Sequence, residues 1–345
     1  MFFPMLFGGR LCSFSDSLAV SGNGVFTFDY AYPYLYVTDE GASGNSILKI
    51  YDVTGTPTLL STTSLPNASG AREPLIVGDL LYVPYRTSRH LAIWNVADRT
   101  APVLSGSVSL PNSSPGGPFA VAVIGSVACV AYAGSFTMAT TAEKVDVSNP
   151  ASPSVIANWG PSPPTISTAT DVISAGGNFV ITGTFTGGSS VPYLAVVDPT
   201  TFATEDWLSF SVSGAVGGKL ASDGSYAYSY AGNTTHLFTF DISNPLVISQ
   251  AHDLNLSGTT GAGAQPSPLC LVDDTDRLYL GRYNGSGLLI AILNISTRST
   301  PSLAGTISTN SETVTDLAVI DGCAGFAWGQ GTGATIHLLE TAPTS

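Results

Sequence analysis

Four carboxylates stand at similar places along the chain, each at or before a short apolar segment, and they are the first candidates for chemistry. They are Asp29, Glu73, Asp171 and Asp316. Oxygen ligands of this kind suit a hard cation such as calcium, so a ring of them is a weak candidate for a metal site. The alternative is that they bond to backbone N–H groups of neighbouring segments, with Lys219 at the corresponding place in a further segment. Both interpretations stay open, and the second is the commoner role of such groups.

Other residue types that carry chemistry are sparse and form no familiar motif. The four histidines show no H-x-H or H-E-x-x-H pair and the four cysteines show no C-x-x-C pair, so zinc and redox motifs are missing. A G-x-S-x-G elbow, a P-loop and a dinucleotide fingerprint are also missing. We therefore expect no catalytic residue and no cofactor. Paired carboxylates for glycoside chemistry stay an alternative, because acids far apart in sequence cannot be paired without a structure.

Repeats predict the elements that would position these residues. A β-type triplet after a tight turn occurs seven times, with central residues 46, 47, 51, 47, 52 and 47 positions apart. The triplets are residues 35–37, 81–83, 128–130, 179–181, 226–228, 278–280 and 325–327. This period matches a β-propeller, in which each blade is a four-stranded sheet. Apolar patterns of helical period are nearly absent.

A second unit follows each of the first six triplets. It is an alternating strand that ends in Asp or Asn, followed by a turn marked by Pro. The residues at the strand ends are Asp52, Asn95, Asp146, Asp198, Asp241 and Asn294. An Asp or Asn side chain can accept N–H bonds from the turn that follows, and proline presets the backbone dihedral there. We therefore assign these six residues a structural role.

This second unit resembles the LVIVD repeat of bacterial propellers, in which an L-x-I-x-D strand is followed by V-S-x-P-x-x-P. The best copy is DVSNPASP at residues 146–153, and the resemblance extends from about residue 25 to 340. The chain departs from the pattern at Asp198, which runs straight into Pro199, and in the seventh repeat, which ends at Glu340 without the Asp. The resemblance implies a propeller and little about function, because the repeat is mainly structural.

The seventh repeat leaves no room for an outer strand, and the N-terminus can supply one. We predict an all-β, seven-bladed β-propeller, a single domain over residues 1–345 in which about residues 4–15 form the outer strand of the last blade. The expected blades span about residues 25–65, 71–110, 118–159, 169–210, 218–255, 268–308 and 314–340. Such closure hides strand edges that would otherwise pair with other chains.

The longer connections are expected on one face of the ring. When the strands of a blade are lettered A to D from the axis outward, the B–C and D–A connections emerge on the same side. Binding residues often lie on loops held by a rigid scaffold, so this side is the candidate binding face. Aromatic and basic residues there suit sugar stacking or protein contact, although single aromatic residues are also ordinary on surfaces. The candidates are Tyr85, Arg86, Arg89, His90, Phe136, Phe185, Tyr193, Tyr230, Arg282, Tyr283 and Trp328.

The composition argues against two classes of partner. Charged residues make up 10% and the net charge is −13, whereas nucleic-acid binding needs a basic footprint. The acidic balance also repels anionic membranes, and no apolar run reaches the roughly 18 residues of a membrane helix, so we expect no membrane insertion. The apolar N-terminus lacks a leading cation and contains Pro4, so it does not resemble a signal peptide.

These observations favour a non-catalytic structural or binding propeller. Scarce lysine, a hydroxyl-rich exterior and the lack of a signal peptide lead us to expect a virion surface or tail-associated protein, as in a phage, involved in host adhesion or particle stability. Its expected partners are proteins of a larger assembly, with cell-surface glycan as a further candidate. One alternative is a bacterial extracellular LVIVD-like binding protein, and another is a polysaccharide hydrolase or lyase. The expected location is the virion or the extracellular surface.

Overall fold

The structure is a computed structural model that describes the backbone of most of the chain. The described residues are 5–7, 10–20, 26–31, 33–39, 46–54, 57–65, 70–111, 116–132, 140–160, 166–185, 191–210, 217–231, 234–257, 269–272, 276–283, 287–310, 314–320, 323–328 and 334–341. Side chains are described in these ranges except at 5–26, 166–167, 272, 282–289 and 307–341.

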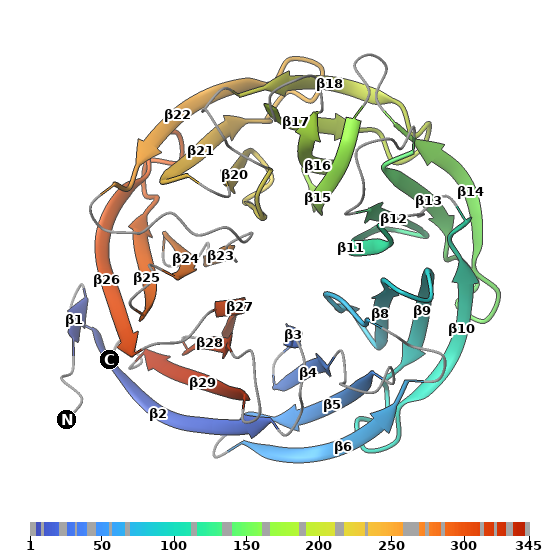
Figure 1. Cartoon of the computed structure of the whole chain (residues 1–345), viewed down its shortest axis with the longest axis horizontal. Coiled ribbons are helices and arrows are strands. Elements are labelled where there is room, and N and C mark those ends of the chain that lie inside the picture. The colour runs from blue at the N-terminus through green and yellow to red at the C-terminus, as the bar shows by residue number, and fades with distance from the viewer. Residues whose placement is uncertain are drawn as a thin grey trace.

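Short strands dominate because β-branched and aromatic residues alternate between turns rich in Gly, Pro and Asx. Antiparallel sheets of these strands surround an axis as the blades of a β-propeller (Figure 1). Blade 1 contains β3 (Phe26–Ala31), β4 (Tyr34–Asp39), β5 (Ile47–Asp52) and β6 (Thr58–Ser64). Blade 2 contains β7 (Leu75–Val77), β8 (Leu80–Tyr85), β9 (His90–Asn95) and β10 (Val103–Ser109). Blade 3 contains β11 (Pro118–Ile124), β12 (Val127–Tyr132), β13 (Ala142–Asp146) and β14 (Ser154–Trp159).

Three further four-stranded blades follow along the chain. Blade 4 contains β15 (Ile166–Ala175), β16 (Asn178–Phe185), β17 (Val191–Val197) and β18 (Thr204–Ser209). Blade 5 contains β19 (Leu220–Ser222), β20 (Tyr226–Tyr230), β21 (His236–Asp241) and β22 (Ser249–Asn255). Blade 6 contains β23 (Leu269–Val272), β24 (Arg277–Tyr283), β25 (Gly287–Asn294) and β26 (Ser302–Asn310).

The remaining sheet joins the two ends of the chain and has five strands. Its order is β1 (Met5–Phe7), β2 (Arg10–Val20), β29 (Ala334–Thr341), β28 (Cys323–Trp328) and β27 (Val314–Ile320). We call it the closing sheet. The predicted ring of seven blades is therefore wrong: within the described residues, six sheets are four-stranded blades and the closing sheet differs from them in strand number and in origin.

The strand that closes the ring also differs from the predicted one. β2 pairs with β29 from Cys12 to Val20, whereas the expected outer strand was about residues 4–15. The register of this pairing shifts between Phe14 and Asp16. The third and fourth strands of every four-stranded blade show a similar shift, for example between Leu104 and Gly106 in blade 2. β2 thus takes the place of a fourth strand, and β1 adds a strand outside it that the sequence pattern did not indicate.

The core lies between adjacent blades, whose sheets pack face to face. One cluster joins Leu48 and Ile50 of blade 1 to Leu81, Val83 and Trp94 of blade 2. Similar clusters join blades 2 and 3, 3 and 4, 4 and 5, and 5 and 6. Because a middle strand is covered on both faces, it is almost continuously buried, whereas outer strands such as β14 alternate between exposed and half-buried positions.

The antiparallel order of the strands places the connections on two faces. The B–C and D–A connections form one face, which we call the loop face, and the A–B and C–D turns form the opposite turn face. On the turn face, the Asp or Asn at the end of each third strand accepts a backbone N–H from the turn, as the sequence predicts. The six bonds run from Thr54, Ala97, Ser148, Thr200, Ser243 and Ser296 to Asp52, Asn95, Asp146, Asp198, Asp241 and Asn294, at 2.8–3.0 Å.

Candidate functional site

The axis of the ring carries a polar cavity. It has a volume of about 240 Å³ and is lined by Asp29, Glu73, Asp171 and Lys219 together with apolar residues such as Leu220. These side chains come from blades 1, 2, 4 and 5. The first strand of each blade begins at the loop face, which brings residues at equivalent places in the repeat to one level of the axis.

Two of the carboxylates connect neighbouring blades through backbone N–H groups. Asp29 accepts bonds from the N–H of Tyr30 at 2.8 Å and from that of Ile76, in blade 2, at 2.7 Å. Burial outweighs these bonds and raises the pKa of Asp29 to about 6. The carboxylate therefore acts as a bridge between blades 1 and 2.

Asp171 makes the equivalent connection between blades 4 and 5. It accepts bonds from the N–H of Val172 at 3.0 Å and from that of Leu220 at 2.8 Å. Burial raises the pKa of Asp171 to about 6, although the nearby Lys219 favours the charged form. The repetition of this bond pattern shows that the alternative from the sequence, bonding to a neighbouring blade, applies to both residues.

Lys219 links blades across the axis. Its Nζ forms an ion pair with the Glu73 carboxylate of blade 2 and lies 3.6 Å from Asp171 Oδ1 of blade 4. The same Nζ lies 4.9 Å from the centre of the Phe119 ring of blade 3, and the Arg72 guanidinium lies 5.7 Å from that centre. One lysine of blade 5 thus contacts blades 2, 3 and 4.

The carboxylates do not assemble into a metal site in the described part of the chain. There, no group of three or more His, Cys, Asp or Glu side chains has an arrangement that could hold a metal ion. Asp29, Glu73 and Asp171 instead have the backbone and lysine partners given above. The side chain of Asp316 lies outside the described residues, so the prediction for it stays untested.

Four aromatic candidates for the binding face belong to the core. Tyr85, Phe185, Tyr193 and Tyr230 are all at most 6% exposed. The hydroxyl of Tyr85 accepts a bond from Trp94 Nε1 at 3.2 Å, and the hydroxyl of Tyr230 donates to the carbonyl of Thr234. These rings support the loop face from below and are not presented on it. The side chains of the candidates Phe136, Arg282, Tyr283 and Trp328 lie outside the described residues.

The remaining three candidates lie together on the loop face. Arg86 and Arg89 are exposed and His90 is half-buried, and all three belong to the hairpin that joins β8 to β9. Arg86 Nε donates to the carbonyl of Gly116 at 3.2 Å, and His90 Nδ1 lies 2.5 Å from the carbonyl of Ser88.

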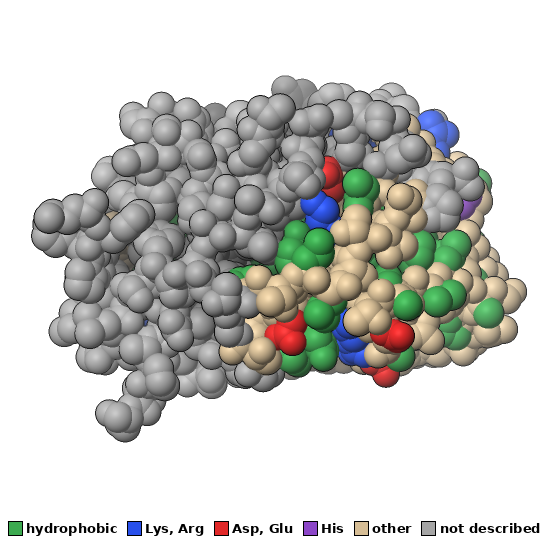
Figure 2. Space-filling view, turned by 90° about the horizontal axis from the view of Figure 1, so that it is seen from below, with side chains coloured by type: hydrophobic (Ala, Val, Ile, Leu, Met, Phe, Trp, Pro, Cys, Tyr) green, Lys and Arg blue, Asp and Glu red, His purple; other side chains and the backbone are tan. Residues whose placement is uncertain are grey.

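Large apolar side chains are exposed on the outer wall of the ring. Leu59, Leu104, Ile156 and Trp207 lie on the outermost strands of four consecutive blades and are 52%, 38%, 52% and 39% exposed. Each lies within two residues of the register shift in its strand. Figure 2 shows hydrophobic side chains at several places on the described part of this wall. These four residues are not among the binding candidates predicted from the sequence, which were placed on the loop face.

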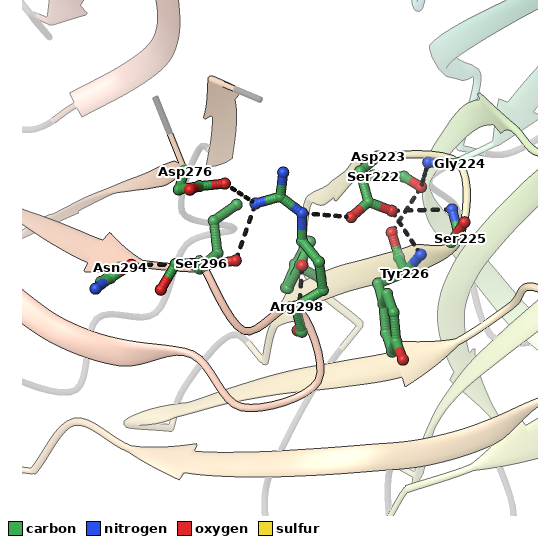
Figure 3. A network of polar contacts seen from close by, with 11 residues as sticks. Ser222, Asp223, Gly224, Ser225, Tyr226, Asp276, Asn294, Ser296 and Arg298 are labelled. Atoms are coloured by element: carbon green, nitrogen blue, oxygen red, sulfur yellow. Dashed lines mark hydrogen bonds and ion pairs between the residues drawn. The ribbon is translucent and has the colours of Figure 1, made fainter. Parts of the chain in front are cut away.

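Two arginines on the turn face connect adjacent blades, and Figure 3 shows the contacts of one of them, Arg298. Arg298 lies in blade 6, where its Nη1 is 2.8 Å from Asp276 Oδ1, and its Nε is 3.0 Å from Asp223 Oδ2 of blade 5. Arg99 of blade 2 pairs with Asp79 at 2.7 Å, and its Nε donates to the Tyr36 hydroxyl of blade 1 at 3.2 Å. Both arginines stand four positions after the Asn of their repeat, a signal that was present in the sequence.

Comparisons with known proteins show the fold alone. No family model matches the sequence, and no curated protein matches it. The resemblance to the LVIVD repeat therefore stays a prediction. Among solved structures, the chain is similar to the Cps50 (Swd1) β-propeller domain of Myceliophteria thermophila, with 10% identity and a TM-score of 0.69 over 95% of this chain and 99% of that one. A propeller fold is consistent with a binding or scaffold role.

Proposed function

We propose that this chain is a non-catalytic propeller that serves as a binding and structural component of a larger protein assembly. In its specific form, the proposal is a virion surface or tail-associated protein that contributes to host adhesion or particle stability. The observation that carries it is the set of exposed apolar residues on the outer wall, Leu59, Leu104, Ile156 and Trp207. Large apolar side chains that recur on one exposed wall fit the apolar centres of protein interfaces.

The outer strands also lack a common protection against contact with other chains. β6, β10 and β14 contain no Lys, Arg or Pro, the residues that often guard an edge strand. Their protection is limited to the local register shift. Protein subunits of an assembly are therefore the partners that fit the outer wall, and the loop face is left available for contacts away from the assembly.

The axial residues support a structural role for the acids. Asp29 and Asp171 hold neighbouring blades through backbone bonds, and Glu73 pairs with Lys219. Each of these carboxylates thus has a partner that contributes to the ring itself. Among the described residues, no helix is long and apolar enough to cross a membrane.

Variants of the outer wall test the proposal. A tagged chain carrying Leu104→Ser and Ile156→Ser is introduced into the native source, and the fraction that sediments with large particles is measured. We expect that fraction to fall at least about fivefold, because each exposed anchor of an interface contributes on the order of 1 kcal/mol or more. The variant Thr62→Ala, on the exposed face of β6, is the matched control and should sediment like the wild type. Equal recovery of all three proteins in particles would overturn the role of the wall.

A further inference from the structure

The positive charges of this acidic chain are distributed unevenly. The sequence has 11 Lys and Arg residues, and the structure describes the side chains of all but Arg10 and Arg282. Within that set, Arg86 and Arg89 alone are exposed, and they belong to the same hairpin between β8 and β9. We call residues 86–90 the basic hairpin.

The other cations with described side chains are engaged within the ring. Lys219 pairs with Glu73 at the axis, and Arg99 and Arg298 join turns on the turn face. Lys144 donates to the carbonyl of Thr200 at 2.6 Å, and Arg277 donates to that of Asp276 at 3.3 Å. Arg86 Nε also donates to a carbonyl, that of Gly116, but its side chain and that of Arg89 are exposed and form no ion pair with any part of the chain that the structure describes.

Backbone contacts hold the basic hairpin on both sides. The N–H of Arg86 donates to the carbonyl of Gly70 at 2.8 Å, and the carbonyl of Arg89 accepts from Leu110 at 2.9 Å. Gly117, at φ +88°, approaches so closely that a side chain there would meet the Arg86 carbonyl at 2.1 Å. Contacts with the two D–A connections therefore fix the position of the hairpin. This lowers the entropic cost of ordering the hairpin when a partner binds.

Arg89 occupies a backbone conformation that arginine seldom adopts. Its φ is +57°, in the left-handed region where Gly or Asn costs least. A non-glycine residue in this region costs on the order of 1 kcal/mol, and such outliers gather at functional sites. The position therefore favours a role for the arginine side chain beyond the turn itself.

The charges around the hairpin define the direction from which an anion can approach. In the described parts of blades 1 to 3, the exposed carboxylates are Asp79 and Asp98, and both belong to turns of the turn face. Asp79 is paired with Arg99, so the exposed charges without an ion pair in these described parts are Asp98 on the turn face and the arginines of the basic hairpin on the loop face, which favour approach of an anionic partner from the loop face. Complementary charge of this kind determines orientation more than total affinity.

We propose that the basic hairpin is a contact site for an anionic polysaccharide that carries carboxylate or sulfate groups. This inference rests on the proposed binding function. The exposed tip contains Arg86, Thr87 and Arg89 and no apolar residue, so it offers neither the apolar centre of a protein interface nor a wedge for a lipid surface. A guanidinium matches a carboxylate or sulfate with two parallel bonds, and the hydroxyl of Thr87 suits sugar hydroxyls.

The test measures binding of the full chain to heparin, polygalacturonate, neutral dextran and vesicles of phosphatidylcholine with phosphatidylserine, at about 0.1 M salt, where long-range repulsion is screened over roughly 10 Å. The wild type should bind heparin or polygalacturonate and should bind neither dextran nor vesicles. The variant Arg86→Gln with Arg89→Gln should weaken that binding at least about tenfold. The variant Arg89→Gly should also weaken it, while its melting temperature stays equal to or above that of the wild type, because glycine relieves the φ of +57°.

The control Arg277→Gln removes one positive charge from the turn face and should leave polysaccharide binding unchanged. The proposal is overturned if the wild type binds no anionic polysaccharide, if the hairpin variants bind as the wild type does, or if the hairpin instead mediates binding to vesicles. These results are separate from the proposed function, which fails only if the chain does not assemble with other proteins. If the chain sediments in particles but binds neither heparin nor polygalacturonate, the hairpin site is refuted and the proposed function is not.

Discussion

The guanidinium of Arg298 lies 3.0 Å, Nε to Oδ2, from the carboxylate of Asp223, so a turn of blade 6 is tied to the first turn of blade 5. The side chain of Asp223 is only 9% exposed and that of Arg298 is 24% exposed. Asp223 also accepts N–H bonds from Ser225 and Tyr226, at 2.9 and 2.7 Å. The Asp223 carboxylate thus stabilises its own turn through N–H bonds and also forms the ion pair with Arg298 of the neighbouring blade.

Removal of this arginine should loosen the contact between blades 5 and 6. We expect Arg298→Ala to lower the free energy of unfolding by about 1–3 kcal/mol, because it leaves a largely buried carboxylate without its charged partner. Arg298→Lys should lower the free energy of unfolding by a smaller amount, because it keeps the positive charge. It should still be less stable than the wild type, because lysine cannot bond both Asp223 and Asp276. Urea denaturation measures the effect, with the exposed Arg86→Ala as the control. An Arg298→Ala variant as stable as that control would show that the pair contributes nothing.

Substitution of Lys219 at the axis should destabilise the protein more than substitution of an exposed cation. We expect Lys219→Met to destabilise the protein by about 3 kcal/mol, because Glu73 and Asp171 then face each other without a cation. Adding Glu73→Gln should recover part of the loss, since one of the two uncompensated charges disappears. Thermal and urea denaturation of the single and double variants measure this coupling. A double variant less stable than Lys219→Met alone would contradict the axial ion pair.

The pH dependence of stability follows from the raised pKa of Asp29, about 6 against an ordinary value of 3.8. A group whose pKa is higher in the folded state contributes stability below the unfolded pKa, and this contribution is lost as the pH rises through the folded pKa. The melting temperature should therefore fall by roughly 2–4 °C between pH 4.5 and 7 on account of this residue. The pKa values of Asp52, Asp98, Asp146 and Asp198 are lowered, so their contribution is lost only at more acidic pH.

Asp29→Asn separates this residue from the other titrating groups. The amide keeps one acceptor oxygen and cannot ionise, so the melting temperature of the variant should change less between pH 4.5 and 7 than that of the wild type. A scan of melting temperature against pH measures both proteins. Identical pH profiles would mean that Asp29 does not titrate in this window.

Truncation of the N-terminus tests the closing sheet. Deletion of residues 1–9 removes β1 and keeps β2, so we expect a monomer that still unfolds cooperatively. Deletion of residues 1–20 also removes the partner of β29 and exposes its edge, and we expect aggregation and a broad transition. Analytical size exclusion and calorimetry compare the two proteins. A sharp, unshifted transition after the longer deletion would show that β2 is dispensable for closure.

Local chemistry explains why much of the strand arrangement was accessible from sequence. The turn after each third strand is specified by an Asp or Asn that bonds to the next residues, for example Asp146 to Ser148 at 2.9 Å. Such a signal needs only neighbours in sequence. The predicted N-terminal strand, about residues 4–15, differs from the observed strand β2. The apolar pattern of residues 4–15 does not distinguish a single strand from the hairpin of β1 and β2.

The features that were missed depend on distant contacts. Tyr85, Tyr193 and Tyr230 were assigned to the binding face, but the middle strands of a blade are covered on both sides, and alternation in sequence does not show this. The contact of Lys219 with Glu73 crosses the axis between blades that are far apart in the chain. The exposure of the apolar residues on the outer wall depends on which strands are outermost, and local sequence does not specify that arrangement.

The most direct test of the central claim is the size and composition of the native particle that carries this chain, measured by sedimentation followed by mass spectrometry. If the chain is a component of a larger protein assembly, it should sediment with other proteins in particles far heavier than its own 35.4 kDa. Sedimentation of the native protein alone, near 35.4 kDa, would contradict the account.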